Sequence, residues 1–587
     1  MRQRFLNMLA LVGFFSFVGC AAEDVLSDDP SGDDELITFS AVQEGTATKA
    51  EISQSDSKVI NWSTGDAITV YDGGGNSVRF GLTEGAGGTR ASFSGKITQT
   101  AESYLALSPY QGGTFSDDGK IQFVTMKAKQ TAVAGSFDPE AALMVSKTAP
   151  GGTSMSFRNV VGYVKVTPQF DCEMISLISE DSSDLLAGTV SIDYNDGEPA
   201  VTVSDDGVNS VSISGDIVAG KTYYIAVLPG TLKSGFRLVF FAKDGKDAIK
   251  STSKPLEVKR NTVINLGSVN STALTQIPYV TFTADAEQIF KMSLCDGITS
   301  LQYSVNNAPW QDIVSNKEIV FGGSDGSLRL RGMSALGTAI KSYASGSTEV
   351  YSSIKFGKKN VYVSCAGDIR TLVDYSNHEN AKTDRARFCY LFIRCANLLS
   401  TPDLPAMTLA DDCYYAMFSG CTGLTTAPDL PATTLADYCY YVMFSNCKGL
   451  TTAPDLPAMT MATGCYCSMF SNCTGLTSAP DLPAMTMATW CYEKMFSGCT
   501  GLTSAPVLPA TTLNTDCYWS MFSGCTNLRL VRIGALKVPI KITNGNKITA
   551  FDGWLDQCAA KGIIRKPSAL TLPSSAVPSG WRVVDYD

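Results

Sequence analysis

The segment LADYCYYVMFSNCKGL, residues 435–450, contains the pattern that decides the fold of the C-terminal part of this chain. Its motif Met443-Phe444-Ser445 recurs with a period of 26 residues, and Leu391-Phe392 stands one period before the first full copy. The other copies begin at Met417, Met469, Met495 and Met521. Six units between about 386 and 535 indicate a repeat protein, in which each unit buries its apolar side against its neighbours.

Within one unit, the spacing of apolar residues predicts a short helix. Thr434 followed three residues later by Asp437 is similar to a capping box. Leu435, Cys439 and Met443 then fall at i, i+4 and i+8. This spacing predicts a helix of about eleven residues with that face turned inward.

Glycine or asparagine stands three and six residues after each Met of the motif, which predicts two left-handed turns per repeat, the first of them ending the helix. The first column holds Gly420, Asn446, Asn472, Gly498 and Gly524. The second column holds Asn397, Gly423, Gly449, Gly475, Gly501 and Asn527. A short strand should follow with Leu450 inward, and Pro454 should stop its ladder because proline donates no hydrogen bond.

The length, phase and residues of this unit resemble BspA-like leucine-rich repeats, and a period of 26 lies within the leucine-rich range. The resemblance implies a leucine-rich-repeat solenoid with short convex helices. It also implies adhesion to host extracellular-matrix or mucosal ligands, or to neighbouring bacteria. The chain leaves the repeat after about 535, where Trp554, Pro578 and Trp581 indicate a C-terminal cap.

Most of the 18 cysteines fall into two columns of the repeat. The helical column is Cys413, Cys439, Cys465, Cys491 and Cys517, and the column before the strand is Cys395, Cys421, Cys447, Cys473, Cys499 and Cys525. Helices pack about 8–10 Å apart, too far for disulfides along the first column, whereas strands stack at about 4.8 Å, within reach for the second. We favour buried thiols, with disulfides and a metal site as alternatives, and interpret Cys467 as a surface variant of a Tyr position.

Two further positions of the repeat vary while the apolar columns hold, and variation marks the solvent face. Their large aromatic residues are the candidate ligand contacts, with drift on an unconstrained surface as the alternative. These candidates are Tyr415, Tyr438, Tyr441, Trp490 and Trp519. Exposed aromatic rings also make a glycan-capturing lipoprotein an alternative function. A row formed by Asp403, Asp429, Asp455 and Asp481 is interpreted as a solvated edge, with a basic partner as the alternative.

The N-terminus predicts the destination of the protein. Arg2 and Arg4 precede a short apolar run that ends at Cys20, which is typical of a secretory signal. This arrangement resembles a bacterial lipobox, so Cys20 is expected to be acylated and to bind the outer-membrane lipid. The acidic residues between 23 and 35 resemble the surface-export signal of Bacteroidetes lipoproteins, with a solvated spacer as the alternative. We therefore expect a lipid-anchored protein exposed at the surface of the cell outer membrane.

Four segments further along carry a second resemblance, namely 37–41 (ITFSA), 48–50 (TKA), 62–71 (WSTGDAITVY) and 260–267 (RNTVINLG). Together they resemble the fimbrillin-like (Mfa-like) family of Bacteroidales surface lipoproteins and type V pilins. In such pilins a trypsin-like protease removes the first strand, which opens a groove for a donor strand. Lys49 is the candidate cleavage site, with an ordinary loop lysine as the alternative. An accessory or tip subunit of type V-like fimbriae, with fimbrial subunits as partners, is therefore an alternative function.

The composition excludes several classes of function. A net charge of −10 argues against a nucleic-acid partner, and one histidine excludes sites that need two imidazoles. That histidine, His378, lies in a polar segment near Asp374, and a loop histidine is the favoured interpretation over a hydrolytic triad. We expect a binding protein rather than an enzyme, with no cofactor and no metal.

The predicted fold is mainly β. It comprises two fimbrillin-like β-sandwich domains, a third β-domain, a leucine-rich-repeat solenoid and a cap. The predicted boundaries are 1–19 for the signal peptide, 20–35 for an acidic tether, 36–155 and 156–270 for the sandwiches, 276–387 for the β-domain, 388–535 for the repeats and 536–587 for the cap.

Overall fold

The computed structural model describes residues 35–44, 61–115, 120–194, 197–340, 351–543 and 546–586. Strands and short 3-10 turns form the regular structure, and these ranges contain no α-helix. The prediction of a mainly β chain is confirmed, and the prediction of short helices in the repeats is wrong. The chain forms two compact units. Unit 1 is Met1–Thr125, Ala142–Val160 and Thr189–Ser204, and unit 2 is Met126–Ala141, Val161–Gly188 and Asp205–Asp587.

Unit 1 contains a closed barrel rather than the expected sandwich. In order around the barrel, its strands are β1 (Glu35–Gln43), β10 (Ser154–Asn159), β9 (Met144–Lys147), β5 (Leu105–Ser108), β2 (Ala67–Tyr71), β3 (Ser77–Glu84) and β4 (Arg90–Ile97). β1 closes the barrel because it pairs parallel with β10 and antiparallel with β4. Alternate residues of β1 point inward, so that Phe39 packs against Phe80 and Tyr104. A smaller sheet contains β14 (Ala200–Val203), β13 (Gly188–Asp193), β7 (Lys120–Met126) and β6 (Thr114–Phe115).

Unit 2 begins with a three-stranded sheet, a six-stranded sheet and a strand pair. The first is β16 (Tyr223–Val227), β11 (Gly162–Pro168) and β21 (Val263–Val269). The second is β22 (Thr275–Gln276), β19 (Ala248–Thr252), β18 (Phe236–Ala242), β12 (Cys172–Ser179), β15 (Ser210–Ile217) and β8 (Lys129–Thr131). The strand pair is β17 (Gly230–Leu232) and β20 (Leu256–Val258). Strands β11 and β18 are buried along most of their length, as expected for apolar strands inside a domain.

Two more sheets of unit 2 precede the repeats. One is β26 (Gln311–Asp312), β25 (Leu301–Val305), β28 (Leu328–Gly332), β23 (Val280–Thr283) and β30 (Ser364–Ala366). The other is β27 (Ile319–Phe321), β24 (Gln288–Ser293) and β29 (Ser353–Phe356). Their core continues without a break into the repeats and the cap, as the contact of Phe282 with Phe392 shows.

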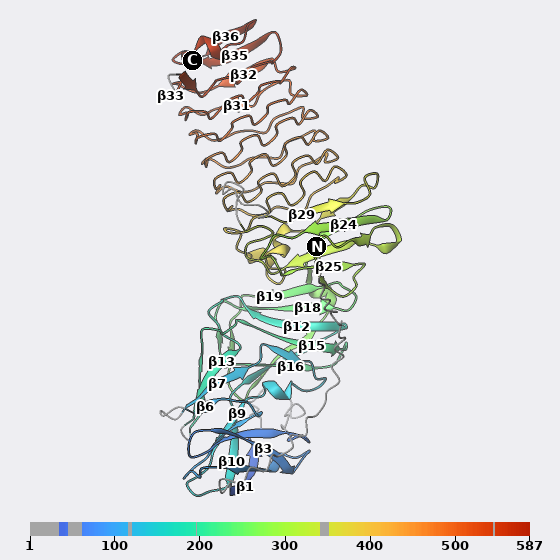
Figure 1. The fold of residues 1–587 in the computed structure, drawn as a ribbon, viewed down its shortest axis with the longest axis vertical. Coiled ribbons are helices and arrows are strands. Elements are labelled where there is room, and N and C mark those ends of the chain that lie inside the picture. The colour runs from blue at the N-terminus through green and yellow to red at the C-terminus, as the bar shows by residue number, and fades with distance from the viewer. Residues whose placement is uncertain are drawn as a thin grey trace, which may run out of the picture. The chain divides into compact units, whose positions relative to one another are not determined.

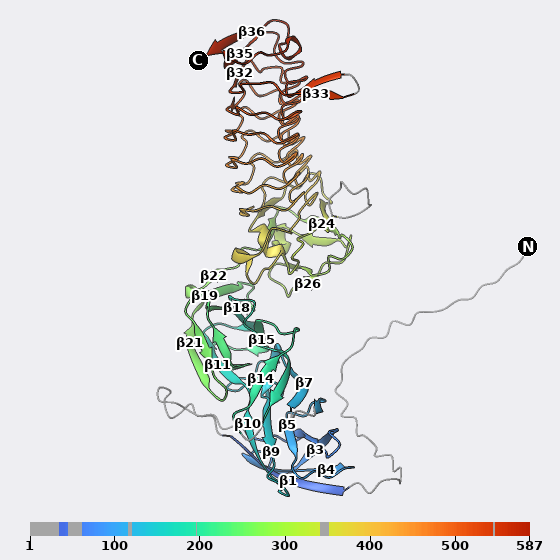
Figure 2. The same cartoon turned by 90° about the vertical axis from the view of Figure 1, so that its left-hand side faces the viewer.

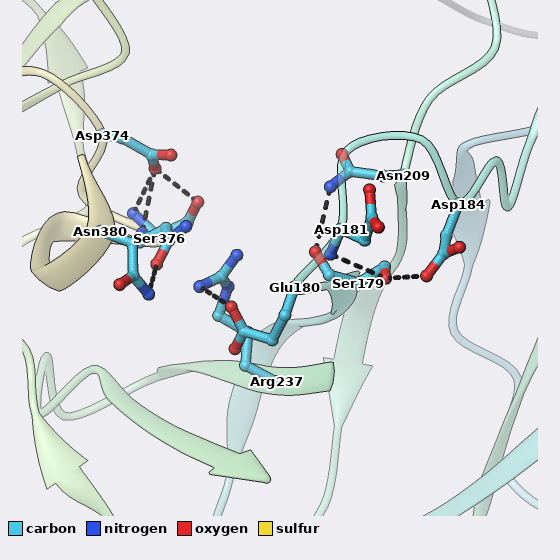
Figure 3. A network of polar contacts seen from close by, with 10 residues as sticks. Ser179, Glu180, Asp181, Asp184, Asn209, Arg237, Asp374, Ser376 and Asn380 are labelled. Atoms are coloured by element: carbon cyan, nitrogen blue, oxygen red, sulfur yellow. Dashed lines mark hydrogen bonds and ion pairs between the residues drawn. The ribbon is translucent and has the colours of Figure 1, made fainter. Parts of the chain in front are cut away.

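Arginine and aromatic side chains join these sheets to the six-stranded sheet. The Arg331 guanidinium lies 4.3 Å from the ring centroid of Trp310 and 4.3 Å from that of Tyr375. The buried carboxylate of Asp247 accepts a 2.8 Å hydrogen bond from the Tyr279 hydroxyl. Nearby, Arg237 of β18 forms an ion pair with Glu180, opposite the loop that contains Asp374, Ser376 and Asn380 (Figure 3).

The repeats form successive coils between β29 and β31 without any helical ribbon (Figure 1). In each coil, successive backbone N–H groups alternate between two kinds of partner: one donates to a carbonyl of the same repeat, and the following one donates to a carbonyl of the next repeat. Met417 donates to the carbonyl of Tyr414 at 3.1 Å, whereas Ala416 donates to that of Tyr441 at 2.8 Å. Every fourth residue is left-handed, as at Asp412 (φ 57°), Ala416 (φ 51°) and Gly420 (φ 77°). Overlapping β-turns therefore produce the four-residue inward spacing that the sequence analysis assigned to a helix.

One of the two predicted glycine columns is left-handed and the other is not. Gly420, Asn446, Asn472, Gly498 and Gly524 have positive φ angles, as predicted. The prediction for the second column is wrong, because Gly423 and its equivalents do not have positive φ. A Cβ on Gly423 would stand 2.6 Å from the carbonyl oxygen of Ala396, and one on Gly449 would stand 2.7 Å from that of Thr422. At these two glycines the preceding coil lies too close for a Cβ without a shift of the backbone, whereas Asn527 occupies the same column and bonds to the carbonyl of Thr500.

Val442 occupies one of these left-handed positions, with φ 47°. A left-handed backbone costs an L-residue about 1–2 kcal/mol, and a branched Cβ makes it worse. Val442→Gly relieves this strain, and the greater conformational entropy that glycine loses on folding offsets part of the gain. We expect the free energy of unfolding to rise by about 1 kcal/mol in urea titrations. Val442→Ala is the matched control, since it removes the methyl groups and keeps the strain. Equal effects of the two variants would contradict this explanation.

A small sheet ends the stack. It contains β31 (Val507–Leu508), β32 (Leu530–Ile533), β35 (Gly562–Pro567) and β36 (Trp581–Tyr586), and a hairpin of β33 (Ile540–Thr543) and β34 (Asn546–Thr549) stands out beside it (Figure 2). The indole of Trp554 donates to the carbonyl of Ala576 at 2.7 Å, and that of Trp581 donates to Ala559 at 2.7 Å. Both rings are buried, so these residues cover the end of the core as expected of a cap.

Candidate ligand-binding faces of the repeats

Two buried ladders of rings hold the coils in register. Neighbouring rings of the phenylalanine ladder lie 5.3–5.7 Å apart between centroids, and those of the tyrosine ladder lie 5.6–6.2 Å apart. The phenylalanines are 392, 418, 444, 470, 496 and 522, and the tyrosines are 414, 440, 466, 492 and 518. Because equivalent residues stack directly, any outward residue type recurs as a row on the surface.

The cysteine columns belong to this interior. The cysteines of the described residues are all free thiols, which supports buried thiols over disulfides. In the second column the thiols from Cys421 to Cys525 each donate to a phenylalanine carbonyl of the previous coil, as from Cys447 to Phe418 at 3.1 Å, whereas Cys395 donates to the carbonyl of Ile354 at 3.2 Å. Burial raises the pKa of the Cys447 thiol to about 12. Cys467 is buried as well, so its interpretation as a surface residue is wrong.

These thiols form no metal site in the described part of the chain. Groups of three or more His, Cys, Asp or Glu side chains suited to a metal ion are absent there.

Three of the five candidate aromatic residues pack against one another. Tyr415 and Tyr441 are stacked with ring centroids 4.6 Å apart, and the ring of Tyr390 lies 5.3 Å from that of Tyr415. The ring of Tyr438 meets Tyr441 edge-on at 5.9 Å and occupies the space where Gly464 lacks a side chain. Stacked rings cover each other's faces, so this tyrosine cluster presents edges and hydroxyl groups rather than flat platforms.

The two tryptophans lie further along the stack. Trp490 is 36% exposed and Trp519 is 40% exposed. The ammonium group of Lys494 lies 4.4 Å from the ring centroid of Trp519, a cation–π contact. Among the described residues, neither tryptophan makes a ring contact with the tyrosine cluster. The structure therefore divides the five candidates into a packed tyrosine cluster and a more accessible tryptophan pair.

A second face was missed by the sequence analysis apart from its acidic row. The extended segment reads Asp-Leu-Pro-Ala-Met at 403–407, 455–459 and 481–485, with Thr in place of Met at 433 and 511 and Val in place of Asp at 507. It alternates, so that Leu456 and Ala458 are buried while Asp455, Pro457 and Met459 are exposed. Alternation with a period of two residues predicts such a face. The prolines were interpreted only as residues that end a strand. We call this surface the Asp-Pro-Met face.

Other predicted residues lie elsewhere. Cys20 and Lys49 fall outside the described residues, so lipidation and cleavage stay predictions. His378 lies in a 3-10 turn, His378–Asn380, within the predicted polar segment, and its side chain is buried. Burial lowers its pKa, although Asp368 and Glu379 oppose this shift. In the described ranges no helix is long and apolar enough to cross a membrane.

Comparison with known proteins gives partial structural likenesses. A candidate cell adhesion protein from Bacteroides uniformis is 14% identical, with a TM-score of 0.26, over 41% of this chain and 94% of its own. A fimbrial protein from Bacteroides ovatus is 14% identical, with a TM-score of 0.20, over 42% of this chain and 52% of its own. A leucine-rich repeat protein from Bacteroides ovatus is 15% identical, with a TM-score of 0.14, over 35% of this chain and 73% of its own. No family model and no curated protein matches the chain.

Proposed function

We propose that this protein is a surface-exposed lipoprotein adhesin of the outer membrane, anchored through acylated Cys20. In this proposal the 26-residue units form a BspA-like leucine-rich-repeat solenoid, which fimbrillin-like β-domains connect to the anchor. The supporting observation is that varied residues, including Trp490 and Trp519, are displayed over an interior that repeats from coil to coil. Such a scaffold separates the residues that maintain the fold from those available to a ligand. Host matrix proteins, mucosal proteins or glycans, and surfaces of other bacteria are the proposed ligands.

The test is binding of the whole protein to immobilised matrix proteins, mucin, a glycan array and bacterial cells. The variant Trp490→Gly/Trp519→Glu uses residues that the same rows already contain at Gly464 and Glu493, so its coils should still fold. If the tryptophans anchor the ligand, binding should fall by about 30-fold or more. Binding to glycans alone would select the glycan-capturing alternative. Binding to none of these surfaces would refute the adhesin proposal.

A fimbrial subunit is the second candidate, and β1 is the observation that favours it. β1 is bonded on both edges and directly precedes the segment that contains Lys49. Its removal would separate β4 from β10 and expose the groove that now holds Phe39. Mass spectrometry of protein shed from the surface distinguishes the outcomes. An N-terminus at Ala50 supports this candidate, whereas acylated Cys20 on every molecule contradicts it.

A further inference from the structure

The Asp-Pro-Met face consists of three parallel rows that run along the stack. The acidic row is Asp403, Asp429, Asp455 and Asp481; the proline row is Pro405, Pro431, Pro457, Pro483 and Pro509; the third row is Met407, Thr433, Met459, Met485 and Thr511. Backbone hydrogen bonds join two neighbouring pairs of the third row, from Thr433 to the carbonyl of Met407 at 3.2 Å and from Thr511 to that of Met485 at 3.2 Å. The prolines lack an N–H, so a partner would meet side chains here rather than add a strand.

The third row leaves large apolar groups in water. Met407, Met459 and Met485 are 52%, 58% and 44% exposed. Leu536, which is 51% exposed, bonds through its N–H to Thr511 and extends the row. Thr433 separates Met407 from Met459, whereas Met459 and Met485 stand on neighbouring coils. Methionine side chains are flexible and adapt to varied apolar partners.

The acidic row carries unneutralised charge. Within the described residues, none of its four carboxylates forms a salt bridge. Partial burial raises the pKa of Asp403, and repulsion from Asp368 and Asp429 adds to the effect. A cationic partner would relieve this repulsion.

The spacing of the rows selects the shape of that partner. Asp455 and Met459 are four residues apart on an extended segment, or about 13 Å, close to the width of an α-helix with its side chains. Beside this face Thr408 pairs with Thr434, and Thr486 with Thr512, in parallel bridges, which spaces neighbouring coils about 4.8 Å apart. One turn of an α-helix rises about 5.4 Å. A helix laid along the face would therefore meet a new Asp and a new Met or Thr at each turn.

We propose that the Asp-Pro-Met face binds a basic amphipathic α-helix of a partner protein. Lysine or arginine side chains pair with the acidic row, and the apolar stripe covers the methionine row. This inference rests on the proposed adhesin function and names the chemistry of one ligand.

The probe is a labelled synthetic helix of about 18 residues, with Leu at helical spacing and Lys on the adjacent face, titrated with the whole protein. A scrambled peptide of equal composition is its control, and we expect at least tenfold weaker binding for it. Met459→Thr/Met485→Thr introduces the residue present at 433 and 511, and should weaken binding about tenfold. Asp455→Asn/Asp481→Asn should weaken binding at low salt and flatten its salt dependence.

Thr474→Lys is the matched control outside this face, because Lys448 occupies the same row. It adds positive charge without touching the Asp-Pro-Met face and should leave affinity unchanged. Equal binding of the patterned and scrambled peptides would overturn the inference. So would wild-type affinity of the methionine variant for the peptide, or a loss of affinity in Thr474→Lys as large as that in the methionine and aspartate variants. Those results would leave adhesion to matrix, mucin or cells intact, whereas failure of the adhesin proposal would abolish adhesion in the wild-type protein.

Discussion

Raising the pH from 9 to about 10 should unfold the stacked repeats in one cooperative transition. The cysteine thiols have an unperturbed pKa of 9.0, and burial raises the pKa of Cys413, Cys447, Cys465 and Cys517 to about 12. The folded state therefore retains protons that the unfolded state loses. Stability that is present below pH 9 disappears as the pH rises toward 12. Each thiol removes about 1.4 kcal/mol per pH unit in that window, so four of them at pH 10 remove about 5 kcal/mol, comparable with the stability of a domain.

The measurement is a pH titration that follows circular dichroism and thiolate absorbance together. Both signals should change at the same pH, because the thiols ionise only when the coils open. Unit 1 is the internal control, since its described residues contain no cysteine. Gradual thiolate formation near pH 9 with the fold intact would contradict the prediction.

Phe470→Ala should destabilise unit 2 by about 4 kcal/mol in urea unfolding. The Phe470 ring is fully buried and stacks on Phe444 and Phe496 at 5.7 Å on each side. The substitution leaves a cavity in a close-packed core and removes two ring contacts. Stacked coils also depend on their neighbours, so the loss should affect the transition of the whole stack.

Phe470→Leu is the matched variant, because it keeps an apolar side chain and removes only the stacking and part of the volume. Its expected cost is about 2 kcal/mol. If the alanine and leucine variants were equally stable, ring stacking and packing at this position would not hold the coils.

The inward residues of the repeat were predictable from the sequence, whereas the backbone conformation that places them was not. Cys439 and Met443 are buried as predicted, yet they lie on overlapping turns. Inward residues recur every 3.6 positions in a helix and every four in these turns, and over eight residues the two patterns do not differ. The left-handed angles of Tyr438 and Val442 were not predictable, because neither residue type favours that conformation.

The candidate site shows the same division. The five aromatic residues were selected from variation within the repeat, but only the structure shows that Tyr415 and Tyr441 stack on one another. The alternation of buried and exposed residues predicts the Asp-Pro-Met face from the sequence. The prolines were instead interpreted as the end of a strand, so the face was not predicted. The contact of Arg331 with Trp310 and Tyr375 has no local signature, since it joins segments that the chain brings together only on folding.

By itself, the sequence determined the period, the β character and the set of residues that face the interior, because these follow from local pattern and side-chain polarity. Only the tertiary structure decided how those residues are held. In each coil, alternate backbone N–H groups of the turns donate to carbonyl groups of the next coil, as the N–H of Ala416 donates to the carbonyl of Tyr441. A repeat has no such partner in isolation, so its conformation as turns rather than a helix is a property of the stack.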